Sequence, residues 1–355
     1  MIRLGIVGVN YGRTVLLPAF RADPRCMVAA LCGSDQARTA EHARNLDVPK
    51  AYGDWRALID DKDIDAIAIA TVPSLQTQVA LAALAAGKPV FAEKPMASTL
   101  DEARAMRDAA EAAGLPTGID FNFHEIMAWQ RAKALLDGGA VGALRHVAVH
   151  WHVENYAIQN RMRTWKTMRD DGGGVLGNFV SHCFHYLEWF AGSHVGPLSG
   201  LQARVGGLPG DDALDTTVAM ALHYKSGPLV SLSMSCASFR GPGHRIEFYG
   251  EDGTLVLENR TADYMRGFVL SHAKRPGELT IIPVDDPADA AYPDGRIAPS
   301  SRLAAKFVDC LAGKPRYKPN AAPGFAAGFR VQQLIDAAQR ANCEGRFVDV
   351  TPAGL

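Results

Sequence analysis

The chain has 355 residues, which is more than one ordinary hydrophobic core accommodates and suits two domains of typical size. Hydrophobic residues make up 48% and charged residues 21%, a balance that indicates a soluble globular protein rather than a disordered one. The formal net charge of -1 provides no basic field that would attract nucleic acid, so we exclude polyanion binding as a first interpretation.

The chain also lacks the patterns of membrane and exported proteins. No apolar run reaches the roughly 18 to 20 residues that a membrane helix requires. The N-terminus enters a strand pattern without a charged leader, so we expect a cytoplasmic protein with no membrane partner. The cysteines are widely spaced, with no C-x-x-C pair, which is typical of buried thiols rather than a zinc knuckle or disulfide framework.

The first third of the chain alternates short aliphatic runs with helical patterns. Strands are predicted over residues 2–7, 27–32, 66–70, 89–94 and 116–122. Helices are predicted over residues 13–21, 35–45, 74–87 and 99–113. Continuously apolar strands that alternate with helices indicate a parallel sheet covered on both faces. We therefore expect an α/β fold with a doubly wound Rossmann domain over residues 1–122.

The remainder, residues 123–355, changes character. A helix over residues 125–137 precedes segments of period two, namely "RHVAVHWHVE", "TTVAMALHY", "LVSLSMSCAS", "HRIEFYG" and "GTLVLEN". Residues 260–300 are expected to form a loop, followed by two late helices. An antiparallel sheet with one open, apolar-leaning side is usually covered by a partner, so we expect a homodimer or homotetramer.

A candidate phosphate-binding turn, "GIVGVNYGRTV", lies between the first strand and the first helix. A dinucleotide fold requires Gly-x-Gly-x-x-Gly there, because a tight turn lets main-chain N–H groups approach the pyrophosphate. Gly8, Asn10 and Gly12 occupy the expected positions, with Tyr11 and Arg13 beside them. Because asparagine tolerates left-handed backbone angles, Asn10 is expected to preserve the turn.

The end of the second strand bears on the choice of cofactor. An acidic residue there would bind the ribose 2′-hydroxyl of NAD. The sequence instead runs "LCGSDQAR", with Ser34 at the expected acidic position and Arg38 within reach of a 2′-phosphate. This arrangement favours NADP, while the nearby Asp35 keeps NAD open.

The segment "GKPVFAEKPMA" ends the fourth strand at the edge of the sheet where ligands of open α/β folds bind. Together with "GIVGVNYG", "GGGVLGNFVSH" and "HRIEFYGEDGTLVLEN", it resembles the glucose-fructose oxidoreductase, inositol dehydrogenase and rhizopine-catabolism (Gfo/Idh/MocA) family over almost the whole chain. The resemblance implies a Rossmann domain, a C-terminal α+β domain with a large, mostly antiparallel open sheet, and hydride transfer between a nicotinamide and a sugar-like hydroxyl.

The resemblance also implies site residues. Lys94 matches the family's substrate-binding lysine, and His182, after the glycine triplet, matches its acid/base histidine. Asn178 stands where the family has Asp; it can hold a hydroxyl but cannot accept a proton as a carboxylate does. A spacing of four residues places Asn178 and His182 on one helical face. The remaining expected cofactor contacts are Thr71, Pro73, Glu93 and Trp165.

Two alternatives remain open at this stage. The departures at Asn10 and Asn178 suit a protein that binds the cofactor but no longer reacts, serving as a sensor or partner. A carbonyl or imine reductase on an apolar substrate would use an aromatic pocket from Phe121, Phe123, Met127, Trp129 and Trp165. His146, His150 and His152 share a strand face, but neither carboxylate nor cysteine joins them, so we expect no metal.

Overall fold

The computed structural model describes residues 1–168, 171–191, 196–207, 214–225, 227–313 and 322–350. The chain divides into two compact units. The first comprises residues 1–122 and 292–332, and the second comprises residues 123–291 and 333–355. The first unit therefore regains a late stretch of chain, a difference from the single boundary expected after Asn122.

The first unit contains a six-stranded parallel sheet in the order β3-β2-β1-β4-β5-β6. The strands are β1 (Ile2–Val7), β2 (Cys26–Cys32), β3 (Lys50–Tyr52), β4 (Ala66–Ile69), β5 (Val90–Ala92) and β6 (Thr117–Ile119). This is the strand order of a dinucleotide-binding fold, whose ligands bind at the carboxyl ends of the strands. The predicted doubly wound parallel sheet is confirmed.

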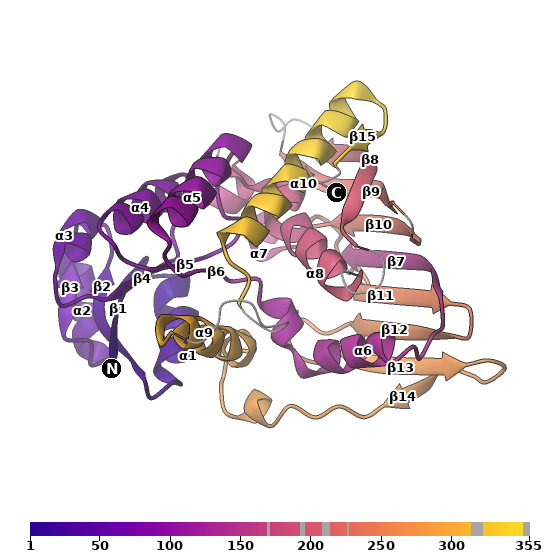
Figure 1. Cartoon of the computed structure of the whole chain (residues 1–355), viewed down its shortest axis with the longest axis horizontal. Coiled ribbons are helices and arrows are strands. Elements are labelled where there is room, and N and C mark those ends of the chain that lie inside the picture. Colours follow the sequence, from indigo (N-terminus) through magenta and orange to yellow (C-terminus); the bar gives the residue numbers. More distant parts are fainter. Residues whose placement is uncertain (169–170, 192–195, 208–213, 226, 314–321, 351–355) are drawn as a thin grey trace. The chain divides into compact units, whose positions relative to one another are not determined.

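Helices lie on both sides of this sheet (Figure 1). They are α1 (Leu17–Arg21), α2 (Gln36–Asn45), α3 (Trp55–Asp60), α4 (Pro73–Ala85), α5 (Leu100–Ala113) and α9 (Ile297–Leu311). The ring of Phe307 on α9 packs on Phe91 of β5, with centroids 5.5 Å apart, and Phe20 of α1 meets Phe91 at 5.3 Å. Burial of these rings explains why residues 292–332 belong to the first unit.

The second unit contains a nine-stranded sheet in the order β14-β13-β12-β11-β7-β10-β9-β8-β15, which is antiparallel except for the β7–β10 pair. Its strands are β7 (Leu144–His152), β8 (Leu198–Gly207), β9 (Asp215–Tyr224), β10 (Leu229–Ser235), β11 (Gly243–Gly250), β12 (Gly253–Asn259), β13 (Val269–Lys274), β14 (Thr280–Ile282) and β15 (Val348–Asp349). The predicted large, mostly antiparallel sheet is confirmed. The loop expected over residues 260–300 is wrong in part, because β13 and β14 extend the sheet there.

The helical segments of the second unit are η2 (Asn122–Glu125), α6 (Met127–Asp137), α7 (Tyr156–Gln159), η3 (Trp165–Thr167), η5 (Leu176–Val180), α8 (Ser181–Ala191) and η6 (Pro287–Ala290). The long helix α10 (Phe325–Glu344) begins in the first unit and ends in the second. Phe190 of α8 packs on Phe248 of β11, with ring centroids 4.9 Å apart. Along β7, Val147, Val149 and Trp151 are buried and His150 is exposed, as period-two alternation predicts.

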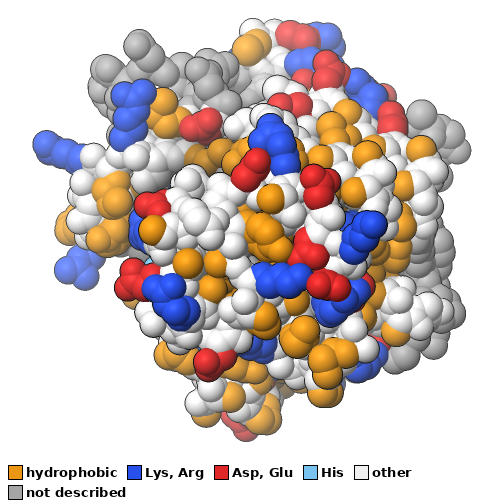
Figure 2. Space-filling model, turned by 90° about the vertical axis from the view of Figure 1, so that its left-hand side faces the viewer, with side chains coloured by type: hydrophobic (Ala, Val, Ile, Leu, Met, Phe, Trp, Pro, Cys, Tyr) orange, Lys and Arg blue, Asp and Glu red, His pale blue; other side chains and the backbone are white. Residues whose placement is uncertain are grey.

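The outward side chains of the central strands are more polar than the sequence pattern suggested. His146 of β7 meets the hydroxyl of Ser231 on β10 at 3.0 Å, and Arg245 of β11 forms ion pairs with Glu247 and Glu258. Figure 2 shows a different face, the left-hand side of Figure 1, where acidic and basic side chains are interspersed among the described residues without a field of one sign.

No helix within the described ranges has both the length and the apolarity needed to cross a membrane.

Candidate functional site

The turn after β1 depends on two glycines. Gly8 has φ 110°, donates its N–H to the carbonyl of Cys32 at 2.8 Å, and would place a Cβ 2.2 Å from the carbonyl oxygen of Ala70. A Cβ on Gly12 would come within 2.8 Å of the Ile6 side chain. Gly8 is thus required by the turn and Gly12 by the close packing of the first helix on β1, which are two of the three glycine roles in a dinucleotide fold.

Asn10 does not have the left-handed backbone that the sequence suggested. It is exposed, it is not among the described residues with positive φ, and its carbonyl accepts hydrogen bonds from the N–H and hydroxyl of Thr14. The strained position of the turn is Gly8 instead. The helix that follows starts as a π turn, η1 (Gly12–Leu16), before α1. Pro18 lacks an N–H for the α-helical bond to Thr14, which accounts for this wider turn.

Two other predicted residues of the turn have partners within the first unit. The hydroxyl of Tyr11 donates to Asp120 Oδ2 at 2.9 Å, and the guanidinium of Arg296 lies 5.2 Å from the ring centroid. Nε of Arg13 donates to the carbonyl of Val9 at 3.1 Å. The side chain of Tyr11 is therefore directed at Asp120, a contact that sequence reasoning did not anticipate.

The end of β2 presents the residues expected to select the cofactor. Ser34 and Arg38 are both exposed. Asp35 caps α2, because its Oδ1 accepts a hydrogen bond from the N–H of Arg38 at 3.0 Å. The Asp35 carboxylate, which follows β2 near the expected ribose site, is therefore already used to cap α2.

The remaining cofactor contacts predicted in this unit follow β4 and β5. Thr71 lies two residues after the end of β4, its hydroxyl donates to the carbonyl of Val72, and Pro73 is the first residue of α4. Glu93 and Lys94 directly follow β5, with a cis peptide bond between Lys94 and Pro95. Both segments therefore lie at the carboxyl edge of adjacent parallel strands.

Gln76 fixes this segment, a role that sequence reasoning missed. Its buried Nε2 donates to the carbonyls of Glu93 at 2.7 Å, Pro95 at 3.1 Å and Met96 at 3.0 Å. A polar side chain on the buried face of an otherwise apolar helix was the signal in the sequence. Gln76 thereby positions the backbone on either side of Lys94.

Glu93 lies beside a second carboxyl group. Burial, and then the neighbouring Asp120, raise the pKa of Glu93 well above its usual range, and Lys94 offsets part of this rise. Asp120 directly follows β6 and is buried, with 1% of its surface exposed. Sequence reasoning did not identify Asp120 as part of the site.

In the second unit, the glycine triplet shapes the approach to the predicted catalytic helix. Gly172 and Gly174 have φ 77° and 87°, and a Cβ on Gly173 would lie 2.2 Å from the carbonyl oxygen of Trp165. Asp215, the first residue of β9, accepts a hydrogen bond from the N–H of Leu176 at 2.8 Å. Asp215 therefore anchors the start of η5, another positioning contact that the sequence did not reveal.

Asn178 and His182 lie on consecutive helical segments, Asn178 in η5 and His182 in α8. His182 is buried, and its ring meets the ring of Phe123 edge-on with centroids 4.8 Å apart. The next histidine on α8, His185, lies beside His124; burial, and then this neighbour, lower the pKa of His185 well below its usual value. This direction of the pKa shift favours the neutral imidazole of His185.

Trp165, expected to contact the cofactor, is the first residue of η3 and is half-buried. Its carbonyl faces Gly173, and Lys166 Nζ lies 5.9 Å from the indole centroid. The predicted catalytic groups thus fall on both units, with Glu93 and Lys94 on the first and Asn178, His182 and Trp165 on the second.

Models of known protein families match both units. A model described as an oxidoreductase family with an NAD-binding Rossmann fold matches residues 2–121, and a model of the Gfo/Idh/MocA C-terminal domain matches residues 129–256. The chain belongs to the Gfo/Idh/MocA family. This Gfo/Idh/MocA protein is accordingly an oxidoreductase with a nicotinamide-nucleotide-binding domain, and the resemblance inferred from its motifs is confirmed.

Curated relatives span most of the chain. An uncharacterized oxidoreductase of Synechocystis sp. is 29% identical over 98% of this chain and 96% of its own length. Levoglucosan dehydrogenase of Pseudarthrobacter phenanthrenivorans is 25% identical over 88% of this chain and 86% of its own. Among solved structures, levoglucosan dehydrogenase in complex with NADH and levoglucosan superposes with a TM-score of 0.83 at 23% identity, over 99% of both chains. At that identity the superposition establishes the shared fold.

The aromatic pocket considered for an apolar substrate is not supported. Of its five residues, Phe121, Phe123 and Trp129 are buried, with 1%, 2% and 0% of their surfaces exposed, whereas Met127 and Trp165 are half-buried. Trp129 packs against Tyr186 with centroids 4.9 Å apart, as part of the core of the second unit. These rings stabilise the oxidoreductase fold rather than offering an open wall to a ligand.

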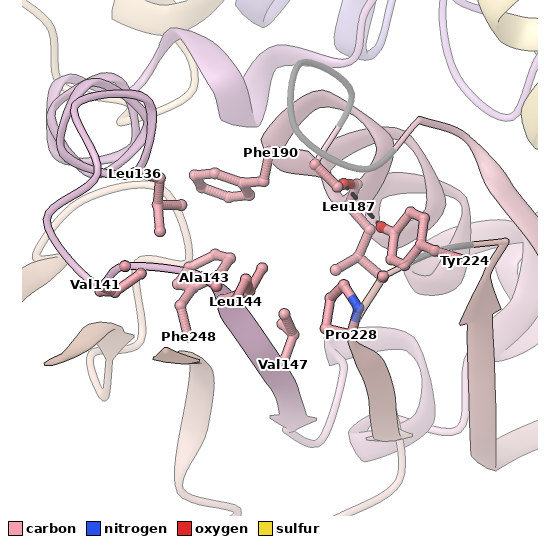
Figure 3. A pocket seen from close by; sticks show the side chains of 13 residues that line it. Leu136, Val141, Ala143, Leu144, Val147, Leu187, Phe190, Tyr224, Pro228 and Phe248 are labelled. Carbon is pink, nitrogen blue, oxygen red and sulfur yellow. Dashed lines mark hydrogen bonds between the residues drawn. The ribbon is translucent and has the colours of Figure 1, made fainter. Parts of the chain in front are cut away.

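A cavity of about 340 Å³ lies elsewhere in the second unit (Figure 3). Its lining side chains include Leu136, Val147, Leu187, Phe190, Tyr224 and Phe248. The hydroxyl of Tyr224 is directed at the carbonyl of Leu187, to which it donates at 3.2 Å. Of the described residues that line this cavity, none carries a charge, so it does not suit a substrate with many hydroxyl groups.

The histidines of β7 form hydrogen bonds to serine across the sheet. His146 and His152 meet the hydroxyls of Ser231 and Ser233, each at 3.0 Å, and His150 is exposed. Among the residues that the structure describes, no group of three or more potential ligands could hold a metal ion.

Proposed function

We propose that this oxidoreductase transfers a hydride between NAD(P) and a hydroxyl or carbonyl carbon of a sugar, a polyol or a sugar-derived substrate. The observation that carries the proposal is the placement of Lys94 at the carboxyl edge of a dinucleotide-binding sheet, in a segment fixed by Gln76. Relatives named levoglucosan dehydrogenase and inositol 2-dehydrogenase support this substrate class. The latter relative, from Saccharopolyspora erythraea, is 27% identical over 72% of each chain.

The residues of the first unit suit a dinucleotide. The glycine at position 8 permits the tight turn; the exposed Ser34 follows β2, and the exposed Arg38 lies in the first turn of α2. We assign the pyrophosphate to residues 8–13, the adenosine ribose to Ser34 and Arg38, and the nicotinamide side to Thr71, Pro73 and Glu93. When bound, the nicotinamide supplies the hydride acceptor or donor.

The chain's own groups manage the proton and the substrate oxygen. In the oxidation direction, His182 accepts the proton of the substrate hydroxyl as the hydride leaves the carbon that bears this hydroxyl. In the reduction direction, His182 returns that proton to the oxygen. The ammonium group of Lys94 orients the substrate oxygen and stabilises its developing negative charge. Asn178 holds a second hydroxyl through its amide, and it cannot replace His182 as the base.

Turnover with a panel of polyols and keto sugars tests this function. The expected result is a change in nicotinamide absorbance with at least one member of the panel, with either NADP(H) or NAD(H). Tight cofactor binding without turnover, and without hydride exchange into the bound cofactor, would favour the alternative of a sensor that the Asn178 replacement suggests.

Arg38 should determine the preference for NADP. Arg38→Ala is expected to weaken NADPH binding by roughly 10-fold or more, because the 2′-phosphate loses a charge-assisted hydrogen bond, while NADH binding changes little. Fluorescence titration with both cofactors measures the two affinities. Arg44→Ala removes the same charge from an exposed position later on α2 and serves as the control. Equal losses for NADPH and NADH would contradict the assignment.

Asn178→Asp restores the carboxylate expected from the family pattern. Activity should be retained, and the pH optimum should move upward, because an anion close to His182 stabilises the protonated imidazole. The pH profile of kcat/KM measures the shift, and Asn178→Ala is the uncharged control. A profile that moves downward would place Asn178 away from the acid/base group.

The homo-oligomer through the open sheet face and the cytoplasmic location remain predictions. The hydroxyl and charged groups on the outward side of the central strands suit a polar, hydrogen-bonded interface between subunits rather than a purely apolar one. Light scattering on the purified protein measures the oligomeric state.

A further inference from the structure

Asp120 is a buried carboxylate that acts on Glu93, and the proposed reaction gives it no task. Its Oδ2 accepts a hydrogen bond from the hydroxyl of Tyr11 at 2.9 Å. Its Oδ1 accepts one from the hydroxyl of Ser300 on α9 at 3.3 Å. A carboxylate that is 1% exposed requires such donors, because burial without them is strongly unfavourable.

The direction of these hydrogen bonds is fixed by a further partner. Nδ2 of Asn122 donates to the Ser300 oxygen at 3.1 Å, so the Ser300 hydroxyl hydrogen is left to donate to Asp120. The Tyr11 hydroxyl is likewise a donor, and the positive charge of Arg296 over its ring favours that polarity. Asp120 therefore receives two donated hydrogen bonds, which is the environment of an ionised carboxylate.

The carboxyl group of Glu93 is in the opposite situation. Its Oε1 is buried and has no hydrogen-bond donor among the described residues, while its Oε2 accepts from the Lys94 N–H at a long 3.2 Å. Asp120 and Lys94 are the charged groups that act on it. Burial, the repulsion from Asp120 and a side-chain hydrogen bond shared with Asp120 together raise the pKa of Glu93, and they outweigh the attraction to Lys94. Two buried carboxyls that interact so closely cannot both ionise near neutral pH.

We propose that Asp120, held by Tyr11 and Ser300, is a positioning residue that keeps Glu93 as an uncharged carboxylic acid at the nicotinamide side of the site. The carboxyl pair carries a single negative charge, and that charge resides on Asp120. The role in the reaction rests on the proposed function. Asp120 acts through Glu93 and does not itself touch the reacting atoms.

An uncharged Glu93 has two consequences for a nicotinamide enzyme. An uncharged carboxyl group does not repel a ribose or carboxamide oxygen as a carboxylate would. The oxidised nicotinamide ring carries a positive charge that the reduced ring lacks, so an anion at Glu93 would favour the oxidised form. By placing the charge on Asp120, the site avoids holding oxidised cofactor too tightly for reduction and release to proceed.

The protonation state can be measured without any cofactor. In infrared difference spectra of the full chain at pH 7, the wild type is expected to show the carbonyl absorption of an un-ionised carboxyl group that Glu93→Gln lacks. In Asp120→Asn, the same absorption should disappear on titration at a pH about one unit lower or more, because the repulsion is gone. Coincident wild-type and Glu93→Gln spectra at pH 7 would overturn the proposal.

The pH dependence of cofactor affinity is the second measurement. If Asp120 only stabilised the fold, this pH dependence would not change. As Glu93 ionises with rising pH, the ratio of reduced-form to oxidised-form dissociation constants should increase on the order of ten-fold. This rise should occur at lower pH in Asp120→Asn, at an intermediate pH in Tyr11→Phe, and not at all in Glu93→Gln. Asp101→Asn changes an exposed carboxylate of the same unit and is the matched control.

The two readouts separate this inference from the proposed function. Absence of cofactor binding with the Glu93 absorption intact would overturn the proposed function and the role in the reaction, but not the uncharged carboxyl. Cofactor binding whose affinity ratio stays flat with pH in every variant would overturn the positioning role. Because Glu93→Gln has the shape of the uncharged acid, it should fold even where Asp120→Asn does not.

Discussion

His182→Ala and Lys94→Ala are each expected to reduce turnover by about 100-fold or more, with cofactor binding largely retained. Under the proposed function, the first change removes the group that exchanges the hydroxyl proton, and the second removes the cation that stabilises the substrate oxygen. Steady-state kinetics give the loss in kcat, and fluorescence titration gives the cofactor affinity. If both groups act on one substrate oxygen, as the proposed function holds, the two losses should not add in the double variant.

Matched controls separate chemistry from general damage. His150→Ala removes an exposed histidine from the second unit, and Lys62→Ala removes an exposed lysine from the first, so both should leave turnover unchanged. Added imidazole should restore part of the activity of His182→Ala if the lost group is an acid/base. Near-normal activity in both alanine variants would place the reaction elsewhere in the protein.

The fold was predictable where the local pattern and the tertiary environment agree. The aliphatic runs at β1, β2, β4 and β5 are mostly buried, so the absence of alternation was itself the signal. The short edge strand β3, with the sequence "KAY", is half-buried throughout and carries no such pattern. The edge strand β14 and its neighbour β13 were missed for a similar reason, because only Leu270 among their residues is buried and the apolar alternation is therefore weak.

The candidate site was predictable only where a single motif carries it. The "EKP" segment and the glycine triplet are contiguous in sequence, so their residues could be identified directly. The Asp120 contacts join residues 109 and 180 positions apart, from Tyr11 and Ser300. Nothing local to Ser300 indicates that α9 returns to the first unit. The prediction of a left-handed backbone at Asn10 was wrong for a different reason, because the positive φ of the turn lies at Gly8.

Gly8→Ala is expected to lower the free energy of unfolding by about 3 kcal/mol or more and to abolish tight cofactor binding. Its φ of 110° lies outside the range that alanine adopts readily, and its Cβ would overlap the carbonyl oxygen of Ala70 at 2.2 Å. The obstacle is backbone of the adjacent strand, which cannot rotate away as a side chain can. The turn must therefore shift, and the main-chain N–H groups that would meet the pyrophosphate shift with it.

Gly87→Ala provides the comparison, because it isolates the backbone strain from the overlap. Gly87 has φ 74°, and a Cβ there would meet no atom within 4 Å. Its substitution should therefore cost about 1 kcal/mol and leave cofactor affinity unchanged. Chemical denaturation and cofactor titration of the two variants measure both effects. Equal destabilisation at the two glycines would show that the turn after β1 can yield, and that close approach to Ala70 does not define it.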